Sequence, residues 1–97
     1  MSEILIDHVL LDRVTKAAKE SPRLRMNYNF HESLSSPSQR LLNALEPGTV
    51  LPIHRHRHTA ETYVLLRGRM RVLFYDNDKK EINRYELDPA EGTYGVN

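Results

Sequence analysis

The N-terminal part of the chain has the hydrophobic spacing of an amphipathic helix. Leu10, Val14 and Ala17 recur at intervals of three and four residues within residues 8–20, and charged side chains occupy most of the positions between them. Apolar residues at this spacing lie on one face of a helix. We therefore expect a helix over residues 8–20 whose apolar face covers an open face of a sheet.

The residues that flank this segment carry signals for its two ends. Asp7 is suited to cap the N-terminus with its carboxylate. Pro22 disfavours the helical conformation at Ser21, so the helix should end there. The short apolar run Ile4–Ile6 is compatible with an edge strand before the helix.

From residue 23 onward the apolar positions alternate, which is typical of β-strands. In Arg23–His31 the apolar side chains fall on one parity. The further segments with a strand pattern are 39–46, 61–67, 70–74 and 82–87. The leucine run in 39–46 is also compatible with a helix. The segments between the strands contain turn residues, at 46–49, Gly68, 76–78 and 88–92.

Short strands at near-even spacing predict a mainly β protein, an antiparallel barrel or sandwich that follows the helix. A chain of 97 residues is expected to form one domain. We expect a single domain over residues 1–97, with a helical segment at 1–22 and the β portion at 23–97.

Charge and composition exclude several classes of protein. Fourteen Lys and Arg face 13 Asp and Glu, a near-balance that argues against a dedicated nucleic-acid binder or a polybasic membrane surface. No apolar run is long enough to span a membrane, and the acidic N-terminus is unlike a signal peptide. The absence of cysteine excludes disulfides, and we expect a cytoplasmic protein.

A cluster of imidazoles is the strongest candidate for chemistry. His54 and His56 are two residues apart, so in a strand they point to the same face, while Arg55 and Arg57 point to the other. Glu61 opens the next strand and, if that strand runs back alongside, aims at the same face. Two imidazoles and one carboxylate suit zinc, iron, manganese, nickel or cobalt, and they leave coordination positions open.

Other readings of this cluster remain open. His58 lies at the turn, so we do not count it among the expected ligands, and His8 and His31 are better explained as structural or surface residues. The run could also be a solvated basic strand or an adventitious chelator. Tyr63 and Tyr75 are candidate bases by proximity alone. A phosphate or nucleic-acid surface would use the arginines of the same region, Arg55, Arg57, Arg67, Arg69 and Arg71.

The spacing around the cluster resembles the first cupin motif. Its members are a glycine, two histidines, a glutamate and a second glycine, here Gly48, His54, His56, Glu61 and Gly68. In cupins the two histidines and the glutamate bind a divalent metal inside a small jelly-roll β-barrel. The resemblance therefore implies a cupin-type barrel with His54, His56 and Glu61 as metal ligands.

Two further segments, residues 21–31 and 39–48, are similar to the WbuC-type cupin-fold metalloproteins, small bacterial proteins associated with surface-polysaccharide (O-antigen) gene clusters. This resemblance implies a cytoplasmic, metal-binding protein that forms a homodimer. It leads us to expect a sugar-derived small-molecule ligand. The charge balance and the short apolar runs lead us to expect no nucleic-acid or membrane partner.

The end of the sequence departs from the cupin pattern. A second cupin motif begins with glycine, five residues and proline, and later supplies a third histidine, whereas only residues 93–97 follow Gly92. We therefore expect a truncated product or fragment with an incomplete barrel. Its exposed sheet edges and interior side chains, such as Tyr63, Met70 and Phe74, would favour dimerisation or strand exchange.

Three functions follow from these expectations. A metal with open positions could act as a Lewis acid in a sugar or sugar-nucleotide isomerase or epimerase. The same ligands would serve an iron-dependent dioxygenase. A non-catalytic module that binds a small ligand or metal is the third alternative.

Overall fold

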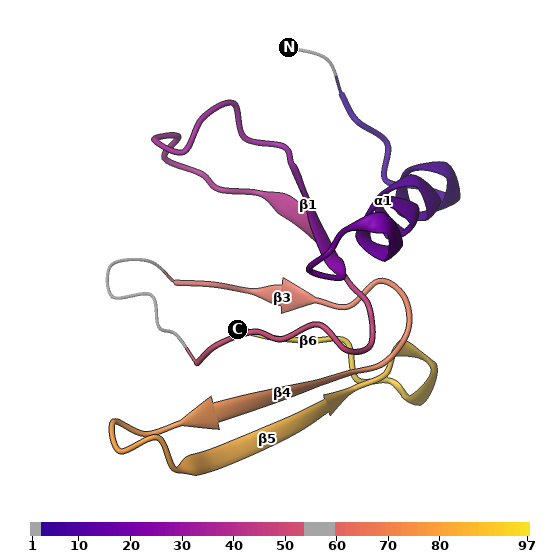
Figure 1. The fold of residues 1–97 in the computed structure, drawn as a ribbon. Helices are drawn as coiled ribbons and strands as arrows, with labels where there is room; N and C mark the ends of the chain where they lie inside the picture. Colours follow the sequence, from indigo (N-terminus) through magenta and orange to yellow (C-terminus); the bar gives the residue numbers. More distant parts are fainter. Residues whose placement is uncertain (1–2, 54–59) are drawn as a thin grey trace. The chain divides into compact units, whose positions relative to one another are not determined.

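The computed structural model describes residues 3–53 and 60–97. They form a mainly β protein with one N-terminal helix and three two-stranded antiparallel sheets (Figure 1). The chain divides into two compact units, Met1–Leu51 and Pro52–Asn97. The single-domain organisation stays a prediction.

In the first unit the expected helix is confirmed as α1 (His8–Glu20). The carboxylate of Asp7 accepts a hydrogen bond from the backbone N–H of Leu10 at 3.0 Å, which caps the helix as predicted. Ser21 has an extended backbone and ends the helix. The edge strand expected at Ile4–Ile6 was wrong: this segment is exposed and pairs with no strand in the described part of the chain.

The alternating segment after the helix folds into a hairpin of β1 (Arg25–Asn29) and β2 (Leu41–Leu45). Its register places Met26 opposite Ala44 and Tyr28 opposite Leu42. These side chains share one face because directly opposed residues point the same way. The ambiguity at residues 39–46 is thus resolved in favour of a strand.

α1 packs against β1 and β2 (Figure 1). Leu10, Val14 and Ala18 are buried, at 6%, 5% and 0% exposure. Arg13 lies over the Tyr28 ring, with its guanidinium carbon 5.6 Å from the ring centroid. The helix therefore covers one face of a sheet, as the hydrophobic pattern predicted.

The second unit contains two short sheets. β4 (Met70–Tyr75) and β5 (Glu81–Leu87) form a hairpin, and β3 (Tyr63–Val64) pairs with β6 (Gly95–Val96) (Figure 1). The strand predicted over residues 61–67 is shortened to two residues in this sheet, because β6 offers only a two-residue partner. No closed barrel is present among the described residues, so a cupin-type barrel stays a prediction.

The structure has turns at the predicted positions, and glycine and aspartate residues take part in them. Thr49 N donates to Glu46 O at 3.1 Å across the first turn, where Gly48 adopts φ +94°. A positive φ at this position favours glycine. The β4–β5 turn is closed by Asp76, whose carboxylate accepts from Asp78 N at 2.8 Å and Lys80 N at 2.9 Å. The turn expected at 88–92 contains a short 3-10 helix, η1 (Pro89–Glu91).

Candidate functional site

Only part of the expected set of metal ligands lies within the described residues. His54 and His56 lie outside the described residues, as do His58, Arg55 and Arg57. Glu61 is described, and it precedes β3 by two residues. The described part of the expected site is therefore Glu61 and the elements that position it.

Tyr63 holds the carboxylate of Glu61. The Tyr63 hydroxyl donates a hydrogen bond to Glu61 Oε2. The two residues are two apart in the sequence and their side chains meet in this contact, so they point to the same side, as the parity of this segment predicted. Glu61 is half-buried and Tyr63 is 44% exposed. This contact orients one carboxylate oxygen and restricts the rotation of the group.

The same contact changes the acidity of the tyrosine. The pKa of Tyr63 is raised to about 12, first by the hydrogen bond that its hydroxyl donates to Glu61, then by partial burial and by the charge of that carboxylate. A negative neighbour disfavours a second anion. Tyr63 therefore stays protonated near neutral pH and acts there as a hydrogen-bond donor to Glu61, and its raised pKa makes it a poor candidate for the general base.

β3, and with it Tyr63, is anchored by the last residues of the chain. Tyr63 lies opposite Val96 and Val64 opposite Gly95. Leu65 N donates to Tyr94 O at 2.7 Å, which extends the pairing by one residue. A β-carbon on Gly95 would lie 2.0 Å from Tyr63 O, so only glycine allows the two backbones this close.

Sequence reasoning missed β6, because two residues have no measurable periodicity. The signal that could have found it is Gly95, since an isolated glycine in a strand often marks close approach of another backbone.

The donor chemistry of the expected ligands suits a divalent metal. Imidazole nitrogens and a carboxylate form the set found at sites of zinc and non-haem iron. No three histidine, aspartate or glutamate side chains form a metal-binding group within residues 3–53 and 60–97. The expected set requires His54 and His56, which lie outside those ranges. In metal centres, a ligating carboxylate typically also accepts a hydrogen bond from a neighbouring group. Glu61 accepts such a bond from Tyr63.

The other histidines lie in the first unit. His8 is the exposed first residue of α1. His31 joins the two ends of the β1–β2 hairpin, because its Nδ1 accepts from Arg40 N at 3.1 Å. Phe30 N also donates to Arg40 O at 2.7 Å beside it. These positions fit the structural or surface roles expected from the sequence.

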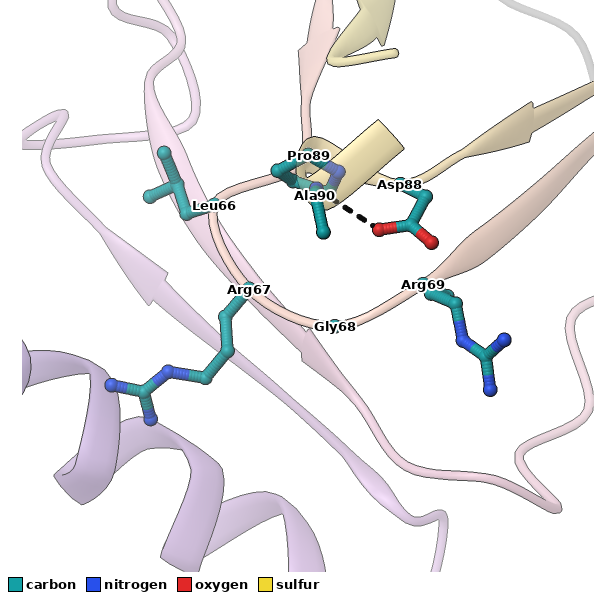
Figure 2. Close-up of a pocket in the computed structure, with 7 residues that line it drawn as sticks. All are labelled: Leu66, Arg67, Gly68, Arg69, Asp88, Pro89 and Ala90. Carbon is teal, nitrogen blue, oxygen red and sulfur yellow. Dashed lines mark hydrogen bonds between the residues drawn. The ribbon is translucent and has the colours of Figure 1, made fainter. Parts of the chain in front are cut away.

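Three of the arginines that a phosphate surface would use lie within the described residues, Arg67, Arg69 and Arg71. Arg71 is paired with Glu86 at 2.7 Å across β4 and β5. Arg67 and Arg69 extend away from each other on either side of Gly68 (Figure 2). They border an open hollow of about 560 Å³, whose other lining residues are Leu66, Asp88, Pro89 and Ala90.

A comparison with protein families assigns the chain to one family. Residues 6–87 match the family model described as "Domain of unknown function (DUF6016)". The chain belongs to the DUF6016 family. The match runs from the residue before the Asp7 cap to the end of β5, so it includes α1, the hairpin β1–β2 and the whole expected ligand set. No curated protein and no solved structure matches this DUF6016 chain.

The described helices contain no membrane span. α1, with 13 residues, is far shorter than the roughly 20 residues that a bilayer requires, and no described helix is long and apolar enough to cross a membrane.

Proposed function

We propose that this DUF6016 protein is a cupin-fold metalloprotein similar to the WbuC type, which binds a divalent metal through His54, His56 and Glu61. The observation that carries the proposal is the first cupin motif spacing. Both of its glycines adopt the backbone conformation that favours glycine, with φ +94° at Gly48 and +87° at Gly68. They turn the chain at the two ends of the ligand segment.

The arrangement around Glu61 supports a metal-ligand role for its carboxylate. Its Oε2 is engaged by the Tyr63 hydroxyl, and β6 holds the strand that carries this hydroxyl. A ligand fixed in this way loses little rotational freedom when metal binds. Tyr63 is thus the residue that orients Glu61, and the histidines would supply the nitrogen donors.

The chemistry that suits this ligand set is Lewis-acid catalysis. His54, His56 and Glu61 would hold a divalent metal with open coordination positions, which would supply a Lewis acid for a bound carbonyl oxygen. We propose a sugar or sugar-nucleotide isomerase or epimerase in surface-polysaccharide biosynthesis, by analogy with the fold and family that the motif resembles. The proposed ligand is a sugar-derived small molecule, and the proposed location is the cytoplasm.

Metal analysis of untagged protein tests the proposal. We expect about one divalent ion per protein chain in the wild type. This ion should be lost in the double variant His54→Ala/His56→Ala and in Glu61→Gln. His8→Ala is the matched control, because His8 is an exposed histidine on α1 remote in sequence from the motif. Unchanged metal content in the double variant would refute the site.

Turnover separates the catalytic alternatives from simple binding. Metal-loaded protein is incubated with a panel of sugar nucleotides, and the products are analysed for isomerised or epimerised sugar. Oxygen consumption that requires iron would instead identify a dioxygenase. Metal binding without any turnover would identify the binding module.

We also propose that the protein acts as a homodimer. Each sheet that the structure describes has two strands, so each leaves strand edges on which a second copy could add. Light scattering that shows a monomer at every concentration tested would contradict this part of the proposal.

A further inference from the structure

The outer edge of β5 is the best template for a second copy of the chain. β5 is the longest of the described strands, with seven residues, and within the described part of the chain it pairs with β4 alone. All its side chains except Leu87 are exposed. An exposed strand edge presents unpaired N–H and C=O groups that another strand can complete.

The charges on β5 are self-complementary. Among the described strands, β5 is the one that carries both acidic and basic side chains: Glu81, Arg84 and Glu86. Arg84 and Glu86 are two residues apart, so they point to the same face. A strand with opposite charges at alternate positions can pair with its own antiparallel copy in a charge-matched register.

We propose that β5 pairs antiparallel with β5 of a second copy, in the register that places Tyr85 opposite Tyr85. This register puts Arg84 opposite Glu86 of the second copy, and by symmetry Glu86 opposite Arg84. Residues directly opposite each other in an antiparallel pair point to the same face of the sheet. A two-fold axis perpendicular to the sheet must therefore pass between one residue and the same residue of the second copy.

The neighbouring registers are less favourable. An axis at Arg84 places two guanidinium groups opposite each other, and like charges in opposed positions are destabilising. An axis at Asn83 pairs Arg84 with Ile82 and Glu81 with Tyr85, and it gives Glu86 no opposite residue within β5. The Tyr85 register is therefore the one that joins opposite charges within β5.

The contacts within one copy leave room for this pairing. Glu86 Oε1 accepts from Arg71 Nε at 2.7 Å, and the Glu86 side chain remains 64% exposed. Arg84 uses Nε and one terminal nitrogen to bind Glu81, at 3.2 Å and 2.7 Å. A guanidinium has five N–H donors, so Arg84 can bind a second carboxylate. The dimer would join separate ion pairs into one network across the edge.

The opposite face of the hairpin adds an apolar contact. Tyr85 is 42% exposed and lies opposite Val72 on β4. Its ring packs edge-on to Phe74, with 6.0 Å between centroids. In the Tyr85 register the two tyrosine rings are adjacent, and each would cover part of the other's exposed apolar surface.

The proposal rests on the homodimer proposed above and is independent of the metal site. The mass of the wild-type protein tests the homodimer, and cross-linking at single positions tests the register. The chain contains no cysteine, so an introduced thiol has no intramolecular partner.

A cysteine at the two-fold axis should cross-link. Residues that face each other across an antiparallel pair have β-carbons about 4.5–5.5 Å apart, close to the separation that a disulfide requires. We expect mild oxidation to convert Tyr85→Cys to a covalent dimer. Asn83→Cys is the matched control on the same face, because four residues then separate it from its copy, and it should stay monomeric on a denaturing gel. Rapid cross-linking of Asn83→Cys, or none for Tyr85→Cys, would overturn the register.

Charge reversal tests the same register without a new covalent bond. Arg84→Glu and Glu86→Arg should each weaken the dimer on the order of tenfold or more, because both cross-axis pairs become like-charged. An equimolar mixture of the two variants should form a heterodimer, since it restores both opposite-charge pairs. Glu81→Gln is the control that breaks an ion pair within one copy and should keep the wild-type dimer. A mixture that stays monomeric, or single variants that dimerise like the wild type, would overturn the proposal.

Discussion

The hydroxyl of Tyr63 donates a hydrogen bond to the carboxylate of Glu61, two residues earlier in the chain. The contact joins the one described member of the expected ligand set to a strand that is anchored by β6. A group that orients a metal ligand typically changes metal affinity about 10–100-fold when it is removed. The contact therefore gives the proposed metal site a consequence that can be measured.

Removing this hydroxyl should weaken metal binding. We expect Tyr63→Phe to lower the affinity for zinc by about tenfold, because Glu61 loses the bond that fixes its orientation. Competition with a chromophoric chelator measures the change. Tyr94→Phe is the matched control, since Tyr94 lies beside β6 and bonds Leu65 through its backbone carbonyl. Equal affinities for Tyr63→Phe and the wild type would mean that Tyr63 does not orient a ligand.

The raised pKa of Tyr63 predicts a loss of stability at high pH. A tyrosine in the unfolded chain ionises with its ordinary pKa of 10.0, whereas the pKa of Tyr63 in the folded protein is about 12. Between these values the unfolded state binds fewer protons, so the free energy of unfolding falls as the pH rises. We expect the stability advantage of chelator-treated wild type over Tyr63→Phe to be constant below this window and to diminish within it.

Denaturant titrations of both proteins across this window measure the difference. An advantage that is independent of pH up to about 12 would contradict the assigned hydrogen bond.

Gly95 should be intolerant of any side chain. A β-carbon at this position would lie 2.0 Å from Tyr63 O, so Gly95→Ala must separate β3 from β6. We expect a loss of stability of roughly 1–3 kcal/mol, the usual cost of overpacking. Hydrogen exchange should also show lost protection at Leu65 N, which bonds to Tyr94 O.

Gly68→Asn is the comparison for this variant. Gly68 has φ +87° but open space around the position of a β-carbon, and asparagine tolerates a positive φ better than most residues. This variant should therefore leave the protection of Leu65 N unchanged. Retained protection in Gly95→Ala would show that the two backbones are farther apart than described.

The packing of α1 predicts different costs for two leucines. Leu10 is 6% exposed and Leu5 is 77% exposed. Leu10→Ala should lower the free energy of unfolding by about 2 kcal/mol or more, because it removes buried apolar surface and leaves a cavity. Leu5→Ala is the control with identical chemistry, and its cost should be within about 0.5 kcal/mol of zero. Thermal or urea unfolding followed by helical circular dichroism distinguishes the two.

The Asp7 cap gives a smaller effect. Asp7→Ala removes the acceptor for Leu10 N and should cost about 1 kcal/mol. Asp7→Asn keeps a side-chain oxygen at the same place and should recover most of the loss. A cost equal for both variants would mean that the charge, rather than the hydrogen bond, stabilises the helix.

Much of the local structure was predictable from the sequence because its causes are local. The helix at 8–20 follows from the spacing of Leu10 and Val14, its start from Asp7 and its end from Pro22. Gly48 and Gly68 turn the chain because a positive φ suits glycine. The strand at Arg25–Asn29 and the β4–β5 hairpin follow from alternation and from turn residues.

The errors occurred where pairing with a distant segment decides the outcome. Ile4–Ile6 has the composition of a strand, but it remains exposed without a partner among the described residues. The segment after Glu61 forms a strand in this sheet only at Tyr63–Val64, where β6 lies alongside. An alternating pattern predicts which face of a sheet a side chain would occupy. It does not predict whether a second strand lies alongside to form the backbone hydrogen bonds.

The candidate site divides in the same way. The sequence by itself determined the residue types and spacing of the expected ligand set and the glycines at both ends, because these depend on residue identity and local conformation. Only the tertiary structure decided that Tyr63 holds Glu61 and that Gly95 allows β6 to anchor this strand. The two strands are separated by about thirty residues of chain, and such a contact depends on pairing that no local pattern records.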